Sequence, residues 1–108
     1  MSAPFVNQLR TRGDVIVMAA AGAPAITVRV EMPEVWDTVR VAVSPEESAI
    51  RLKLRALEAL APTGEAPDEF VMKLRGFEVL DESATLAALG AVDGSIFLLT
   101  HRRRRPVR

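Results

Sequence analysis

The expected fold is decided by one stretch, SAIRLKLRALEALA, which runs from residue 48 to residue 61. Apolar residues recur in it at every third or fourth position, which is the period of an α-helix. Two starts for this helix are open: a capping box at residues 44–47, or Ser48 immediately before the first apolar residue of the period. The loop that follows contains prolines and a glycine, which end the helix.

On a helical projection the apolar residues of this stretch fall into two neighbouring stripes. The first stripe consists of Ala49, Leu52, Ala56, Ala59 and Leu60, and the second of Ile50, Leu54, Leu57 and Ala61. Lys53 falls between them, on an arc that is otherwise apolar. An unpaired ammonium group buried there is costly, so Lys53 requires a partner.

Strands are predicted on both sides of the helix, because apolar and polar residues alternate there. The last strand is expected to turn Ile96 and Leu98 toward the helix. The order of the elements predicts an α+β fold, with one helix across one face of a mixed sheet of four to five strands. The predicted strands are residues 26–32 and 38–43, which form an antiparallel hairpin, then 70–75, a short one around 79–80, and 95–100.

This order, together with several local motifs, resembles the ubiquitin-like β-grasp family over about residues 26–101. The helix entry of that family is similar to Ser48-Ala49 followed by Leu52-Lys53, and its later strands and turns are similar to residues 74–96. The matching motifs there are Leu74-Arg75-Gly76, Leu80-Asp81-Glu82, Thr85-Leu86, Leu89 and Asp93-Gly94-Ser95-Ile96. We therefore expect three parts: a flexible N-terminal extension (1–24), a ubiquitin-like domain (25–101) and a basic tail (102–108).

One departure from the family changes the expected function. Its conjugated modifiers and sulfur carriers end in Gly-Gly, whereas residues 101–108 contain no glycine. The last glycine is Gly94, which the resemblance places inside the fold. Conjugation through this terminus is not expected.

The composition argues against an enzyme. Among 108 residues there is no cysteine, which excludes thiolate metal sites and cysteine nucleophiles, and a single histidine, which excludes a pair of imidazoles. The sequence contains no glycine-rich phosphate loop and no Ser-His-Asp set. We expect no catalytic residue, no metal and no cofactor. Because no apolar run approaches the roughly 20 residues of a spanning helix, we expect a cytoplasmic protein without membrane insertion.

The formal net charge of zero conceals an uneven distribution. Residues 25–101 hold seven basic and thirteen acidic side chains, whereas the tail is basic. The tail is either a solvated end or an element that docks on phosphates or an acidic partner, although the acidic body argues against nucleic acid. The tail arginines are Arg102, Arg103, Arg104, Arg105 and Arg108.

The resemblance implies a partner for Lys53 and a water-facing side for the helix. The equivalent lysine of the family pairs with an acid in the turn after the fourth strand, which is Glu82 or Asp81 here. The second stripe would face water, so we expect a cover over Ile50, Leu54 and Leu57. The cover is either residues 15–18 of the chain itself, a partner protein or a second copy.

The outer face of the sheet is the usual docking surface in ubiquitin-like proteins. By strand alternation we expect Phe97 and Leu99 on it, beside Val71 and Lys73, with Trp36 at the hairpin tip. Lys73 stands where the central apolar residue of the family's patch would be, so a different partner is expected, with Trp36 and Phe97 as aromatic anchors. Scattered apolar surface without a partner is the competing interpretation.

The resulting hypothesis is a non-catalytic, ubiquitin-like interaction module that binds a protein noncovalently. High alanine and arginine usage suggests a bacterial source, where tail-less relatives serve as accessory subunits. The alternatives are an atypical modifier or sulfur carrier, or a binder of acidic surfaces or nucleic acid through the arginine tail.

Overall fold

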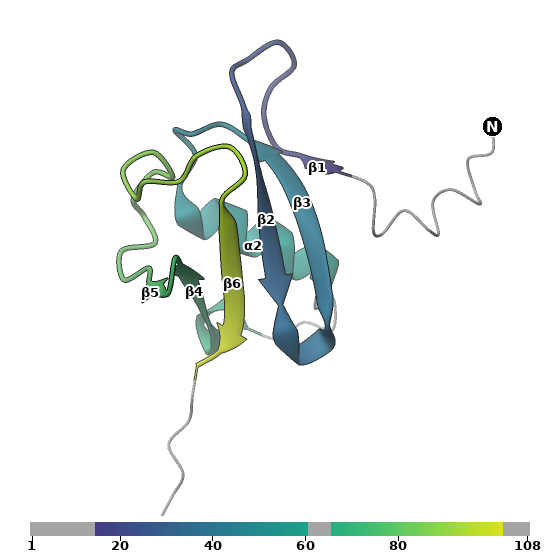
Figure 1. Ribbon diagram of the computed structural model, residues 1–108, viewed down its shortest axis with the longest axis vertical. Helices are drawn as coiled ribbons and strands as arrows, with labels where there is room; N and C mark the ends of the chain where they lie inside the picture. Colours follow the sequence, from purple (N-terminus) through teal and green to yellow (C-terminus); the bar gives the residue numbers. More distant parts are fainter. Residues whose placement is uncertain (1–14, 61–65, 103–108) are drawn as a thin grey trace, which may run out of the picture.

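The computed structural model describes residues 15–60 and 66–102 (Figure 1). It confirms an α+β fold, in which a mixed sheet is covered on one face by one α-helix of the described residues. The strands are β1 (Val15–Val17), β2 (Ile26–Met32), β3 (Asp37–Val43), β4 (Phe70–Leu74), β5 (Phe77–Glu78) and β6 (Ile96–His101). The helix is α2 (Ala49–Leu60), and two short 3₁₀ turns are η1 (Pro33–Val35) and η2 (Pro67–Glu69).

The sheet has the order β1-β3-β2-β6-β4-β5. The hairpin β2–β3 is antiparallel, β2 and β6 pair in parallel at its centre, and β4 pairs antiparallel with both β6 and β5. Helix α2 crosses behind the central strands in Figure 1. The sheet has six strands rather than four to five, because β1 is added at one edge. The short strand β5 lies two residues before the expected one.

Strand β1 corrects the expected boundary of the N-terminal extension. Irregular backbone was expected through residue 24, but Val15–Val17 pair in parallel with Arg40–Ala42 of β3. Three residues are too few to show a period, and their partner lies some 25 positions further along the chain, so this strand exists only through the tertiary pairing. Residues 1–14 lie outside the described part of the chain.

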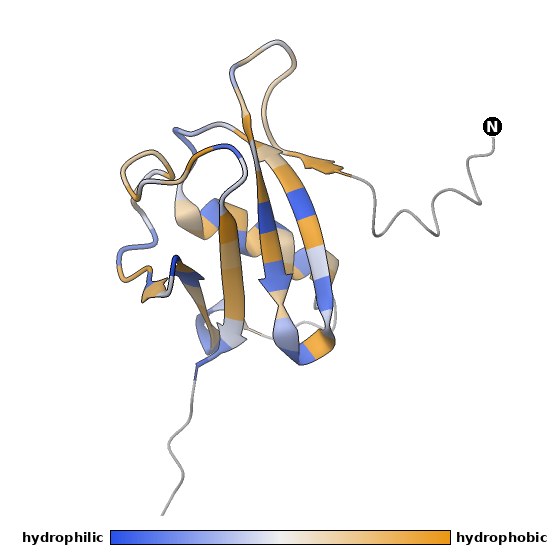
Figure 2. Cartoon of the chain, in the orientation of Figure 1, coloured by the Kyte–Doolittle hydropathy of each residue, from blue (hydrophilic) through white to orange (hydrophobic). Residues whose placement is uncertain are grey.

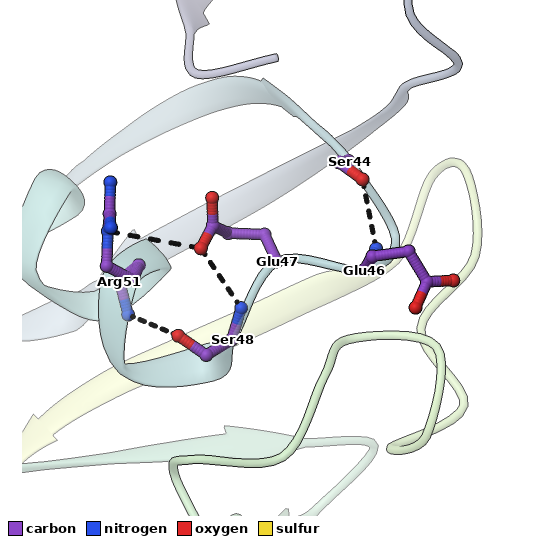
Figure 3. A network of polar contacts seen from close by, with 5 residues as sticks. All are labelled: Ser44, Glu46, Glu47, Ser48 and Arg51. Carbon is purple, nitrogen blue, oxygen red and sulfur yellow. Dashed lines mark hydrogen bonds and ion pairs between the residues drawn. The ribbon is translucent and has the colours of Figure 1, made fainter. Parts of the chain in front are cut away.

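Helix α2 begins after Ser48, the second of the two expected starts. The Ser48 hydroxyl accepts a hydrogen bond from the Arg51 N–H at 3.4 Å (Figure 3). The N–H groups of Ala49 and Ile50 donate to carbonyls in the turn of residues 82–84 at 2.9 and 2.7 Å. The first turn of the helix is thus satisfied by one side chain and by a segment distant in sequence. Residues 44–47 form a lead-in turn.

The core lies between α2 and the inner face of the sheet, and it reverses one expectation for β6. Phe97 and Leu99 are fully buried, whereas Ile96 is exposed and Leu98 is half-buried. The reason is register: Phe97 stands opposite the buried Val30 of β2, and paired residues of neighbouring strands point to the same side of a sheet. Figure 2 shows alternating hydropathy along β2 and β3 but an almost continuously hydrophobic β6, so β6 carries no pattern of its own that assigns its faces.

Candidate interaction surface

The structure contains the ion pair that was expected at Lys53, with Glu82 as the partner. The Lys53 Nζ lies 2.8 Å from the Glu82 Oε2, and the lysine side chain is 1% exposed. The Glu82 carbonyl also accepts from the Ile50 N–H, so this acidic turn is attached to α2 at two points. Next to it, hydrogen bonds from the side chain and backbone of Ser83 lower the pKa of Asp81. The pair therefore holds the acidic turn on the helix.

The second helix stripe does not form a continuous exposed face. Leu57 is buried in the core, Ile50 is half-buried, and only Leu54 is exposed, at 39%. Ala59, which belongs to the first stripe, is exposed instead. The buried arc of α2 is thus rotated toward the second stripe and includes Leu57. Of the covers expected over this stripe, residues 15–18 supply Ile16 and Met18, which pack against the core cluster that contains Leu57. Ala61 lies outside the described residues.

The outer face of the sheet, on the side away from α2, has a row of side chains across five strands. The pairing register places Leu98 of β6 between Glu31 of β2 and Lys73 of β4. The row continues to Thr38 on β3 and Glu78 on β5. A half-buried leucine is therefore flanked by one acid and one base, an arrangement that combines apolar contact with directional charge.

A hollow of about 870 Å³ lies on this outer face over β4 and β6. Val71 and Thr100, which pair across β4 and β6, belong to its lining, and Val71 is almost fully buried there. The remaining lining residues carry charge or can acquire it, and they are Glu34, Glu69, Lys73, Glu78, His101 and Arg102. The hollow thus combines apolar lining with groups of both signs.

The backbone around this hollow is held by contacts between distant segments. The His101 N–H donates to a carboxylate oxygen of Glu34 in η1 at 3.1 Å. The Arg102 N–H donates to the Glu69 carbonyl at 2.6 Å, and its Nε donates to the Asp68 carbonyl at 3.0 Å. Arg102 is therefore part of the domain, whereas the other tail arginines lie outside the described residues.

Trp36 lies at the tip of the β2–β3 hairpin and is 91% exposed. Its φ angle of 52° is in the left-handed region, which is unfavourable for a residue with a bulky side chain. Its N–H donates to the Pro33 carbonyl at 3.0 Å and closes η1. Trp36 also lines a second hollow, of about 390 Å³, together with Arg29 and Arg40. Trp36 is therefore an exposed aromatic side chain in a strained backbone conformation.

The structure places only some of the expected binding residues on the outer face. Trp36 and Lys73 are accessible there, and Val71 contributes to the hollow. Phe97 and Leu99 are core residues and are not available to a partner. The residues that replace them on this face are Ile96 and Leu98, which the sequence interpretation missed because β6 is apolar on both sides.

An exposed apolar group that was not expected lies beyond the edge of this face. Phe77 and Leu80 are both largely exposed and flank a small hollow of about 230 Å³. Phe77 stands opposite the buried Leu74 in the β4–β5 hairpin, so it lies on the core side of this sheet edge, whereas Glu78 lies on the outer face. These two residues extend the accessible apolar surface of this part of the domain.

Neither a metal-binding cluster nor a membrane-spanning helix is found in the part of the chain that the structure describes. Within residues 15–60 and 66–102 there is no group of three or more His, Cys, Asp or Glu side chains arranged to hold a metal ion. In the same part of the chain no helix has the length and hydropathy needed to cross a bilayer.

Comparisons with known proteins identify the architecture. No family model and no curated protein matches the chain. A ubiquitin-like domain of an Arabidopsis thaliana protein superposes with a TM-score of 0.63 at 19% identity, covering 84% of this chain and 92% of that domain. The ubiquitin of Caldiarchaeum subterraneum has a TM-score of 0.63 at 18% identity, covering 75% of this chain and 98% of that one. A protein designed on the template of human erythrocytic ubiquitin has a TM-score of 0.61 at 24% identity, covering 77% of this chain and 99% of that one.

Proposed function

We propose that this chain, which has the ubiquitin-like β-grasp fold, is a non-catalytic module that binds a partner protein noncovalently through the outer face of its sheet. The binding surface is centred on Leu98, with Lys73 and the hollow over Val71 beside it and Trp36 at its margin. As an accessory subunit, the protein acts by holding its partner rather than by converting a substrate. The composition favours a bacterial source.

One observation carries the proposal: Trp36 is 91% exposed in a left-handed backbone conformation, at the margin of a face that contains two hollows. Tryptophan is among the residues that dominate binding energy at protein interfaces. The cost of exposing it in a strained conformation is offset when a partner covers it. Leu98 adds an apolar contact that is flanked by Glu31 and Lys73, which favours a partner with complementary charges.

The experiment is capture from an extract of the native cell with the immobilised full chain. The variants Leu98→Asp and Trp36→Ala change the proposed surface, and Val92→Asp introduces the same charge at an exposed apolar residue of a different segment. We expect the original chain and Val92→Asp to retain the same identified protein, and both surface variants to lose it. Thermal unfolding checks that each variant is folded.

The captured protein is then produced in pure form and titrated against the isotope-labelled chain. Amide shifts are expected at Lys73 and Leu98, because a bound partner changes the surroundings of the row. Retention of the partner by both Leu98→Asp and Trp36→Ala would contradict the proposal.

A further inference from the structure

Phe77 and Leu80 form an exposed apolar pair at and just after β5, the strand at the edge of the sheet opposite to β1 (Figure 1). Phe77 is 76% exposed and Leu80 is 84% exposed. After Trp36, they are the most exposed large apolar side chains of the described residues. Because they flank one hollow, of about 230 Å³, they indicate an interaction site rather than scattered apolar surface.

The inner wall of this hollow belongs to the core. Leu74 and Val79 line it and are buried, and Leu89 lines it and packs against the core cluster. Small-molecule sites usually have volumes of about 300 to 1,000 Å³, which is more than this hollow offers. The hollow therefore suits a single apolar side chain of a protein.

The backbone around the hollow is fixed before any partner binds. The turn between β4 and β5 is Arg75-Gly76, whose φ angles of 54° and 84° are both positive, as in the tight type I′ turn of hairpins. The Arg75 Nη2 donates to the Gly90 carbonyl at 2.8 Å, and the Val79 N–H donates to the Met72 carbonyl at 2.8 Å. A preformed hollow lowers the ordering cost of docking.

The rim of the hollow carries negative charge. Glu78 lines it and is exposed, and Asp81 lies three residues further along the chain. The Ser83 hydroxyl and N–H both donate to the Asp81 Oδ1 and lower the pKa of this exposed carboxyl group, so it is ionised at neutral pH. Arg75 is the basic residue of the lining. Residues 25–101 hold thirteen acidic and seven basic side chains, so the charge of the whole domain also favours a basic partner.

This edge of the sheet favours a helix over a strand as the occupant. Strand β5 contains only Phe77 and Glu78, which is too short an edge for extended main-chain pairing with a partner. An amphipathic helix instead inserts apolar anchors from one face, three or four residues apart. An anchor in the hollow contacts Phe77 and Leu80 on its two sides, because they flank it.

We propose that the hollow between Phe77 and Leu80 is a second protein-binding site, which takes an amphipathic helix of a partner protein. One large apolar side chain of that helix fills the hollow, and its lysine or arginine residues face Glu78 and Asp81. The site is separate from the outer-face surface proposed above, because Phe77 lies on the core side of the sheet.

The probe is a fluorescent amphipathic peptide of leucine and lysine, about 18 residues long so that it forms a helix. A matched peptide carries glutamate in place of every lysine. Anisotropy titrations of the full chain should show binding of the lysine peptide and at least about tenfold weaker binding of the glutamate peptide. Asp81→Asn keeps the oxygen that accepts from Ser83 but removes the charge, so it should weaken binding and reduce its dependence on salt.

The apolar part of the site is tested with Phe77→Ser and Leu80→Ser, which remove exposed apolar surface without adding charge. Val17→Ser makes a matched change at an exposed valine on the opposite edge strand. We expect about fivefold or greater weakening for each of the first two variants, and binding within about twofold of the original chain for Val17→Ser. Thermal unfolding checks that each variant is folded. In the original chain, amide shifts on addition of the lysine peptide should fall on residues 77–82.

Three results would overturn the proposal. The first is absence of binding or equal affinity for the two peptides, and the second is equal affinity of the lysine peptide for the original chain, Phe77→Ser and Leu80→Ser. The third is loss of binding in Leu98→Asp with retention in Leu80→Ser, because the outer face would then be the site of the basic helix. A concentration-dependent dimer that is lost in Leu80→Ser would identify a second copy as the occupant and refute the partner helix.

Discussion

Replacing Glu82 should destabilise the fold far more than replacing Lys53, although the two side chains form one ion pair. The Nζ–Oε2 distance is 2.8 Å, but the lysine side chain is 1% exposed and the glutamate side chain 24%. The variant Glu82→Gln removes the negative charge and leaves an ammonium group buried without a counter-ion. The variant Lys53→Met keeps most of the buried aliphatic volume and leaves a carboxylate that already reaches water.

The magnitudes follow from this asymmetry. Breaking a buried ion pair by removing one partner costs about 3 to 5 kcal/mol, and the partial exposure of Glu82 places the expected loss for Glu82→Gln at the lower end, about 3 kcal/mol. Lys53→Met replaces the buried charge with an apolar side chain of similar length, so we expect a loss of about 1 kcal/mol or less. For a domain of this size, a difference of about 2 kcal/mol corresponds to roughly 8 to 16 °C in the unfolding midpoint.

Urea denaturation of both single variants and of the double variant measures these free energies of unfolding. In the double variant no unpaired charge remains buried, so it should be more stable than Glu82→Gln alone. The reasoning is refuted if Lys53→Met costs as much as Glu82→Gln, or if adding Lys53→Met to Glu82→Gln recovers no stability.

Three further predictions concern the faces and turns of the domain. Phe97→Ala should lower the free energy of unfolding by about 3 to 5 kcal/mol, because Phe97 is a core residue. Leu98→Ala should lower it by under about 1.5 kcal/mol, because Leu98 is only half-buried. Comparable losses in urea denaturation would show that the faces of β6 are wrongly assigned. Trp36→Gly should raise stability by up to about 1 kcal/mol, because glycine relieves the left-handed strain and little buried surface is lost, and a lower unfolding midpoint would contradict this. Ser83→Ala should raise the pKa of Asp81 toward its ordinary value of 3.8, as followed by NMR titration. The lowered pKa of Asp81 stabilises the fold above pH 3.8, and this contribution is lost as the pH falls through the pKa in the folded state. The free energy of unfolding of Ser83→Ala should therefore fall less on acidification than that of the original chain.

Several elements were predictable because each carries its own period. The alternation of residues 26–32 and 38–43 identified β2, β3 and their inward faces, and the spacing of residues 48–61 identified α2. The buried lysine on an apolar arc signalled an ion pair, and the resemblance named the turn that contains Glu82. Trp36 was also placed at the hairpin tip, since the turn follows from the positions of the two strands.

Less of the candidate site could be predicted from the sequence, because its residues are brought together by pairing between distant strands. Strand β6 is apolar on both sides, so only its register with Val30 and Leu74 decides that Phe97 is buried and Leu98 is not. The rotation of α2 that buries Leu57 is likewise set by the sheet beneath it.

Residue order alone thus determined the class of fold, the helix and the hairpin, since these follow from local periodicity and from turn-forming residues. Tertiary structure decided which side of β6 meets water, and it decided that Val15–Val17 become a strand at all. The physical reason is that a strand's partner and register depend on backbone hydrogen bonds between segments far apart in the chain, and a shift of one residue exchanges the buried side chains for the exposed ones.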